Sequence, residues 1–198
     1  MGANVLHPEA IFPVAASSIP INIRNTFEPD NKGTMIMPSV EENSDKIVTG
    51  IAGKKGFTVI QVEKSMMNNE VGFARRLLSV LEFYNISFEH MPSGIDTLSI
   101  VISDNELNGK RNALIKHLNE KMSLDSMEVT NNLALITTVG HGMSKKQGTA
   151  ARLFKALAYA NVNVRMIDQG SSEMNIIVGV NAEDYEAAIK AIYNEFID

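Results

Sequence analysis

Cysteine and tryptophan are absent from this chain of 198 residues, and only eight phenylalanines and four tyrosines are present. Without cysteine the chain cannot form disulfide scaffolds, cysteine nucleophiles or thiolate zinc sites. Long apolar runs are also lacking, because no stretch approaches the ~20 residues that a membrane span requires. Neither end resembles a signal peptide. We therefore expect a soluble, cytoplasmic protein with no membrane partner.

Positive charge is in the minority, since 18 Lys and Arg residues against 23 Asp and Glu residues give a net charge of −5. A nucleic-acid binder needs a basic face to neutralise phosphates, so we expect no nucleic-acid partner. The stretch Gly50–Lys55 does not fit the glycine-rich phosphate loop with its Lys-Ser/Thr ending. No paired spacing typical of a metal site occurs among the histidines, which are His7, His90, His117 and His141. We expect neither catalytic residues nor a metal site.

Proline is scarce beyond the first part of the chain, where five of the six prolines fall within residues 1–38. Because proline fixes φ and removes an amide donor, this segment is predicted to form short elements and turns. Residues 39–45 are polar and acidic, which is typical of a linker. A boundary is therefore expected near residue 40.

The remainder repeats itself at a constant offset of 76 residues, without a gap. Identical residues in this register include the pairs Ile60/Ile136, Met67/Met143, Gly72/Gly148, Ala74/Ala150, Arg76/Arg152, Leu77/Leu153, Leu81/Leu157, Asn85/Asn161, Gly94/Gly170 and Ile100/Ile176. Such a run in one register indicates a duplicated unit. In each copy a helix is predicted to begin at the glycine of the third pair and to end at an asparagine in the left-handed conformation.

Each copy begins with a β-rich segment, Phe57–Glu63 or Leu133–Val139, followed by apolar residues at helical spacing from Phe73 to Tyr84 or from Ala150 to Ala158. Two more strands and a second helix are predicted in each copy: Ser87–Met91, Leu98–Ile102 and Gly109–Lys121, then Asn163–Ile167, Met174–Val180 and Ala182–Phe196. This order is that of a ferredoxin-like βαββαβ module in the α/β (α+β) class, with antiparallel sheets covered by helices.

The two copies differ in their last strand. The first copy has Ser126–Thr130 available as a fourth strand, whereas no strand follows the last helix of the second copy. An open sheet edge needs a partner, and the apolar stretch Ile47–Ala52 is the unassigned candidate. We therefore expect residues 46–56 to complete the second module (132–198), so that the first module (57–131) is inserted in the second.

Several motifs resemble the aspartate kinase family, whose members end in tandem ACT modules, ferredoxin-like units that bind amino acids. The second copy is similar to the last module of that family at Val139-Gly-His-Gly-Met143, at the helix start Gly148 and at Met166–Ile176. Residues Gly2–Ala10 and Ile19–Phe27 resemble the end of the family's catalytic domain, so residues 1–38 are expected to be its C-terminal tail.

The resemblance also implies what this chain does not contain. The Lys-Phe-Gly-Gly-Thr phosphate motif of the kinase domain is missing, as are the residues that hold aspartate and ATP. The chain is expected to be a fragment or a separate regulatory subunit, inactive as a kinase alone and without a cofactor of its own. ATP and Mg²⁺ are expected only in the missing catalytic domain, which would be a partner of this chain.

The start of the first helix, from Glu70 to Ala74, would offer backbone N–H groups and the positive end of a helix dipole to a ligand carboxylate. Glu89 is the candidate for an ammonium group, and Met67 could cover an aliphatic stem. Carried over from the family, the effector site falls on Met67, Glu70, Gly72, Phe73, Ala74, Ser87, Phe88 and Glu89. The same residues can also be explained without any ligand. The glycine would then serve a tight turn, the phenylalanines would belong to the core, and the glutamate would face solvent.

Lysine-inhibited family members resemble this chain at Gly72-Phe73, at Asn85-Ile86-Ser87 and in the acidic Glu89, but not in the loop Pro92–Asp96. The resemblance thus implies an allosteric region that binds lysine and forms a homodimer through its ACT modules, regulating the first step of lysine, threonine and methionine synthesis. The alternatives are a threonine-responsive region, a competent enzyme, and a structural dimerisation module that binds no ligand.

Overall fold

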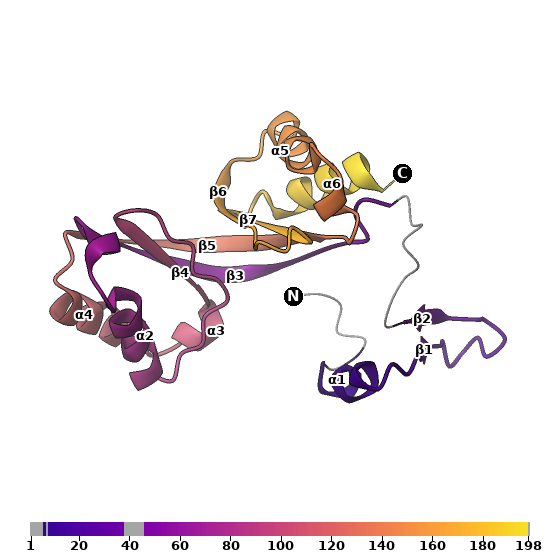
Figure 1. Ribbon diagram of the computed structural model, residues 1–198, viewed down its shortest axis with the longest axis horizontal. Helices are drawn as coiled ribbons and strands as arrows, with labels where there is room; N and C mark the ends of the chain where they lie inside the picture. Colours follow the sequence, from indigo (N-terminus) through magenta and orange to yellow (C-terminus); the bar gives the residue numbers. More distant parts are fainter. Residues whose placement is uncertain (1–5, 7, 38–45, 198) are drawn as a thin grey trace.

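A five-stranded antiparallel sheet in the order β4-β3-β5-β7-β6 forms the centre of the protein (Figure 1). The computed structural model describes residue 6, residues 8–37 and residues 46–197. The strands of the sheet are β3 (Gly50–Glu63), β4 (Thr97–Ser103), β5 (Ser126–Val139), β6 (Val164–Asp168) and β7 (Asn175–Asn181). The linker predicted at residues 39–45 lies outside the described residues.

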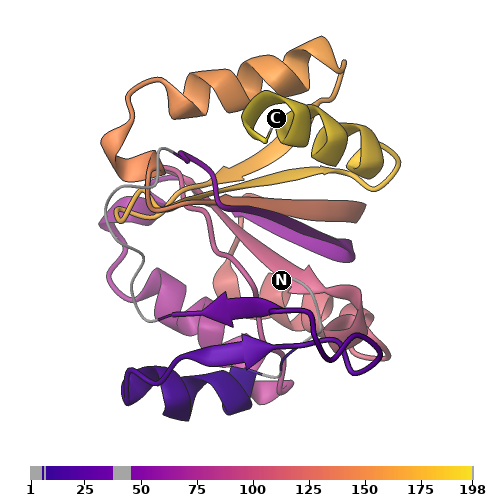
Figure 2. The same cartoon turned by 90° about the vertical axis from the view of Figure 1, so that its right-hand side faces the viewer.

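Helices cover both faces of this sheet. The longer ones are α2 (Phe73–Phe83), α4 (Arg111–Met122), α5 (Thr149–Tyr159) and α6 (Tyr185–Phe196), and α3 (Asp104–Leu107) is a single short turn. Figures 1 and 2 show α2 and α4 on one face and α5 and α6 on the other. Each pair of helices therefore covers one face of its own module's sheet.

The predicted duplication is present in the backbone. The 3₁₀ turn η1 (Met67–Asn69) and α2 recur 76 residues later as η2 (Met143–Lys145) and α5. Gly72 and Gly148 precede the two helices with φ of 80° and 84°, a conformation that glycine adopts without the strain a Cβ would cause. Asn85 and Asn161 follow them with φ of 50° and 55°, as predicted for left-handed residues at the helix ends.

The two longest strands join segments that the sequence predicts as separate. Residues 57–63 continue the strand that starts at Gly50, and residues 126–130 continue into residues 133–139. The prediction of separate strands is wrong, because each long strand continues through a residue with positive φ. These residues are Gly56 (φ 90°) in β3 and Asn132 (φ 58°) in β5. The register of β3 against β5 shifts there, as in a β-bulge, which bends a strand without ending it.

The first half of β3 belongs to the sheet of the second module. Residues Gly50 to Lys55 pair with Val139 to Ala134 of β5, the edge that lacked a partner in the sequence. Just before β3, Ile47 and Val48 pass close to the turn after β5. A Cβ at Gly140 would lie 2.1 Å from the Ile47 carbonyl oxygen, so this turn requires glycine. The modules thus share both long strands.

The predicted strand Ser87–Met91 is not a regular strand. This segment meets β4 only through isolated bridges among the described residues, His90 with Val101 and Ser93 with Leu98. Pro92 has no N–H for a ladder and only accepts a bond, from the Ser99 amide at 2.9 Å. The other predicted elements are present with shifted ends. For example, the helix expected at 109–121 spans 111–122 and follows the unpredicted α3.

Three apolar clusters hold these layers together. Ile60 and Leu77 belong to the core between α2, α4 and the first module's sheet, and Ile136 and Leu153 belong to the equivalent core under α5 and α6. A third cluster, around Phe57, Val101, Leu133, Leu135 and Ile177, lies where the two modules meet. The structure therefore confirms two ferredoxin-like modules built as one interlocked unit.

Candidate functional site

The first half of the predicted effector site lies where β3 ends and α2 begins. Met67 is buried, and Gly72 precedes α2 without any side chain capping the described helix start. Backbone N–H groups at an uncapped N-terminus attract anions, since they carry the positive end of the helix dipole. This end of α2 is therefore suited to a carboxylate.

Glu70 does not present a free negative charge beside this helix. Its Oε2 lies 2.6 Å from the Lys64 Nζ, and its Oε1 pairs with the Arg76 guanidinium. The hydrogen bond from Lys64 and the charges of both cations hold the pKa of Glu70 below its usual value. Two cations around one carboxylate leave a net positive charge, so Glu70 positions Lys64 and Arg76 for an anion.

Phe73 and Phe88 have different surroundings. Phe73 is 4% exposed and packs in the core of the first module. Phe88 is 42% exposed and leaves an apolar surface open. Ala74 is half-buried on the first turn of α2.

The second half of the predicted site, Ser87–Glu89, lies at the other end of β4. Lys64 N donates to Asp96 O, just before β4, whereas Glu89 N donates to Val101 O within β4 at 2.8 Å. Asp96 and Val101 are five residues apart, which at about 3.3 Å per residue separates these two anchor points by roughly 17 Å. Within one chain the structure thus brings Met67, Glu70 and Gly72 together but keeps Glu89 away from them.

An aspartate clamps the turn that precedes the helix start. The Asp125 Oδ2 accepts hydrogen bonds from the amide and the hydroxyl of Ser65, both at 2.6 Å. The side-chain bond, followed by the backbone bond and the nearby Lys64 charge, lowers the pKa of Asp125 from its usual 3.8. A lowered pKa means that the clamp stabilises the fold above the unfolded-state pKa and loses that effect as pH falls through the folded-state pKa.

We therefore expect Asp125→Asn to lower the midpoint of urea unfolding at about pH 7. On acidification to about pH 3, the variant should lose less stability than the wild type, because it has no carboxylate to protonate at this position. Ser65→Ala, which removes one of the two bonds, should behave in an intermediate way. Urea unfolding followed by circular dichroism at both pH values measures the effect. Identical pH dependence in the wild type and Asp125→Asn would contradict this role.

The second module has a hollow at the equivalent helix start, with a volume of about 190 Å³. Met143, Gly148 and Ala150 line it and correspond to Met67, Gly72 and Ala74 of the first module. Lys146 stands where the first module has Glu70, and Glu173 also lines the hollow. The sequence prediction did not include these residues, although the repeat offset points directly to them.

Metal-binding groups and membrane-spanning helices are the next features to consider in the described part of the chain. No group of three or more His, Asp or Glu residues there could hold a metal ion. Likewise, none of the helices in residues 8–37 and 46–197 is both long enough and apolar enough to cross a membrane. His90 is paired instead, with its Nδ1 2.9 Å from the Asp168 Oδ2.

Comparison with known proteins gives consistent matches. A family model described as an ACT domain matches residues 136–196. The crystal structure of Clostridium acetobutylicum aspartate kinase is 54% identical with a TM-score of 0.94, over 99% of this chain and 46% of that one. Aspartokinase 3 of Bacillus subtilis (strain 168) is 40% identical over 98% of this chain and 43% of its own length.

A more distant structure shares the fold. Aspartokinase III of E. coli, in complex with lysine and aspartate, has a TM-score of 0.77 at 24% identity, over 98% of this chain and 42% of that one. The chain thus spans less than half the length of these relatives. It belongs to the aspartate kinase family, in which it matches the C-terminal regulatory region with its ACT domains.

Proposed function

We propose that this chain senses an end-product amino acid, most of all L-lysine, and thereby regulates an aspartate kinase catalytic domain by feedback inhibition. The observation that carries this proposal is the uncapped start of α2 at Gly72, flanked by Lys64 and Arg76. An α-carboxylate would bind there to backbone N–H groups and to two cations.

Glu89 is proposed to bind an ammonium group of the ligand. Its side chain is exposed, and it makes no hydrogen bond or ion pair with any described residue. Because Glu89 lies far from Gly72 in one chain, a complete site needs a second copy of the chain, with ACT modules paired edge to edge. A homodimer would then combine the helix start of one copy with the Ser87–Glu89 segment of the other.

Lysine is favoured over threonine because it carries a second ammonium group. Glu89 would match that charge, whereas the hydroxyl of threonine would leave the carboxylate without a charged partner. A solved structure with this fold, E. coli aspartokinase III, contains lysine and aspartate. Threonine remains the alternative ligand, and a ligand-free dimerisation module is the alternative function.

Regulation requires that the ligand favour one arrangement of the modules over another. We propose that bound lysine favours a pairing that holds the catalytic domain inactive. Residues 8–37 support attachment to such a domain, since Phe12 and Phe27 are 71% and 95% exposed and Met35 is half exposed. ATP-dependent phosphorylation of aspartate, with ATP and Mg²⁺, would belong to that domain.

Thermal unfolding with and without each amino acid tests the proposal. A ligand present at about 100 times its dissociation constant stabilises the folded state by about 2.7 kcal/mol, so lysine should raise the melting temperature while D-lysine should not. A larger rise with threonine would favour the alternative ligand. A dimer whose melting temperature no L-amino acid changes would contradict amino-acid sensing altogether.

A further inference from the structure

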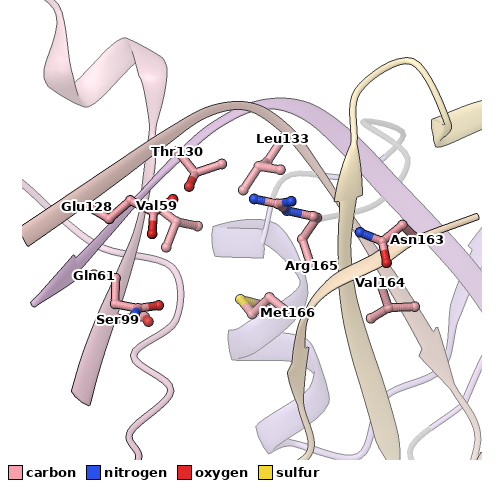
Figure 3. A pocket seen from close by; sticks show the side chains of 10 residues that line it. All are labelled: Val59, Gln61, Ser99, Glu128, Thr130, Leu133, Asn163, Val164, Arg165 and Met166. Carbon is pink, nitrogen blue, oxygen red and sulfur yellow. The ribbon is translucent and has the colours of Figure 1, made fainter. Parts of the chain in front are cut away.

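A groove of about 240 Å³ lies between the two modules, away from both helix starts. Its lining includes Val59, Gln61 and Ser99 of the first module and Arg165 and Met166 of β6 in the second (Figure 3). The groove runs over the sheet face that α2 and α4 leave uncovered. Figure 3 shows the side chains of Arg165 and Met166 on the side of the groove that faces the first module.

The wall formed by β6 is anchored beside the groove. Met166 packs against the cluster of Phe57 and Val101 at the junction of the modules. Two residues further along β6, the Asp168 Oδ2 lies 2.9 Å from the His90 Nδ1 of the first module. These contacts hold β6 beside the sheet of the first module, so the groove is a built feature of the interlocked fold.

Opposite charges line this groove without neutralising each other. Arg165 comes from β6 and Glu128 from the first half of β5. Neither side chain makes an ion pair or hydrogen bond with a residue in the described parts of the chain, and the same holds for the side chains of Gln61 and Thr130. The groove therefore presents a cation, an anion and neutral polar groups to a ligand.

We propose that this groove is a second binding site, for a small zwitterion of the α-amino-acid class. The ligand carboxylate binds to the guanidinium of Arg165, whose fork matches two carboxylate oxygens. The ligand ammonium binds to Glu128, and the side chain of the ligand lies over Val59 and Met166. At about 240 Å³ the groove is smaller than the roughly 300–1,000 Å³ of sites for drug-sized ligands, which fits a compact metabolite.

A ligand in this groove would join the modules, because Glu128 and Arg165 belong to different ones. Its occupancy would favour the arrangement in which β6 lies close to the first module. This site is independent of the proposed effector site, since it uses neither helix start nor Glu89.

The test uses a Glu89→Gln background, in which binding at the proposed effector site is weakened. Each proteinogenic L-amino acid is added singly, and binding is measured by thermal unfolding and by calorimetry. We expect at least one of them to bind, and Arg165→Met or Glu128→Gln to weaken that binding at least about tenfold, as expected for a lost charged hydrogen bond. Lys121→Met and Glu183→Gln, which remove exposed charges elsewhere, should leave it unchanged.

Two results would overturn the groove site. One is the absence of binding by every amino acid in the Glu89→Gln background. The other is binding that persists at full strength in both groove variants, provided that circular dichroism shows them folded. Loss of lysine binding in Glu89→Gln together with groove binding of another amino acid would support both sites, so the failures of the two proposals are distinguishable.

Discussion

Shortening Ile60 or Ile136 to alanine is expected to lower the free energy of unfolding by about 2–5 kcal/mol, because each truncation leaves a cavity in a packed core. Both side chains are fully buried and occupy equivalent positions in the two modules. Since β3 and β5 run through both modules, either variant should lower the melting temperature of the whole unit in a single transition.

Circular dichroism measures the unfolding, and hydrogen exchange at the amides of α2 and α5 reports on the two modules separately. Ile95→Ala serves as the control, because Ile95 is 72% exposed in a loop and its loss should change stability by no more than about 0.5 kcal/mol. If Ile60→Ala unfolded α2 early and left the protection of α5 unchanged, the modules would be independent and the interlocked account would be wrong.

Replacing Glu89 by glutamine is expected to weaken lysine binding at least about tenfold, since it removes one charged partner of an ammonium group. The fold should be unaffected, because the Glu89 contact with β4 uses the backbone amide and not the side chain. Calorimetric titration of lysine into the wild type and the variant measures the change.

Glu82→Gln is the matched control, since it removes an exposed carboxylate from α2 outside the proposed site. Its lysine affinity should equal that of the wild type. Equal affinity in Glu89→Gln would exclude Glu89 as the ammonium partner. Because the site is proposed to span two copies, lysine binding should also weaken when the protein is diluted below its dimer dissociation constant.

The sequence predicts the fold well where the signals are local. The repeated glycines and asparagines locate α2 and α5, because left-handed positions at helix ends favour those residues. The β-rich segments predicted from the sequence end next to Gly56 and Asn132, where the chain instead forms an irregularity inside a long strand. At these positions β3 and β5 stay continuous because they pair with each other, although the paired residues are some 80 positions apart in the sequence. The sequence of one segment alone does not indicate such long-range pairing.

The candidate site, too, was predictable from the sequence only where the signals are local. The helix start at Gly72 is recognisable from its sequence. The resemblance assigned Phe73 to the effector site, whereas its apolar spacing fits the core equally well, and its side chain is buried. The ion pairs of Glu70 with Lys64 and Arg76 depend on how η1 turns the chain back, so the sequence left that carboxylate open to a ligand. The groove at Arg165 was missed, because it exists only once β6 lies beside the first module.

Calorimetry of this chain with lysine and, separately, with threonine tests the central claim most directly. Amino-acid sensing predicts a saturable heat of binding for lysine, with one site per chain at the start of α2, and a weaker heat or none for threonine. Saturable binding of threonine alone would change the ligand but keep the sensor. No heat with either amino acid, from protein that is folded and dimeric, would contradict the account.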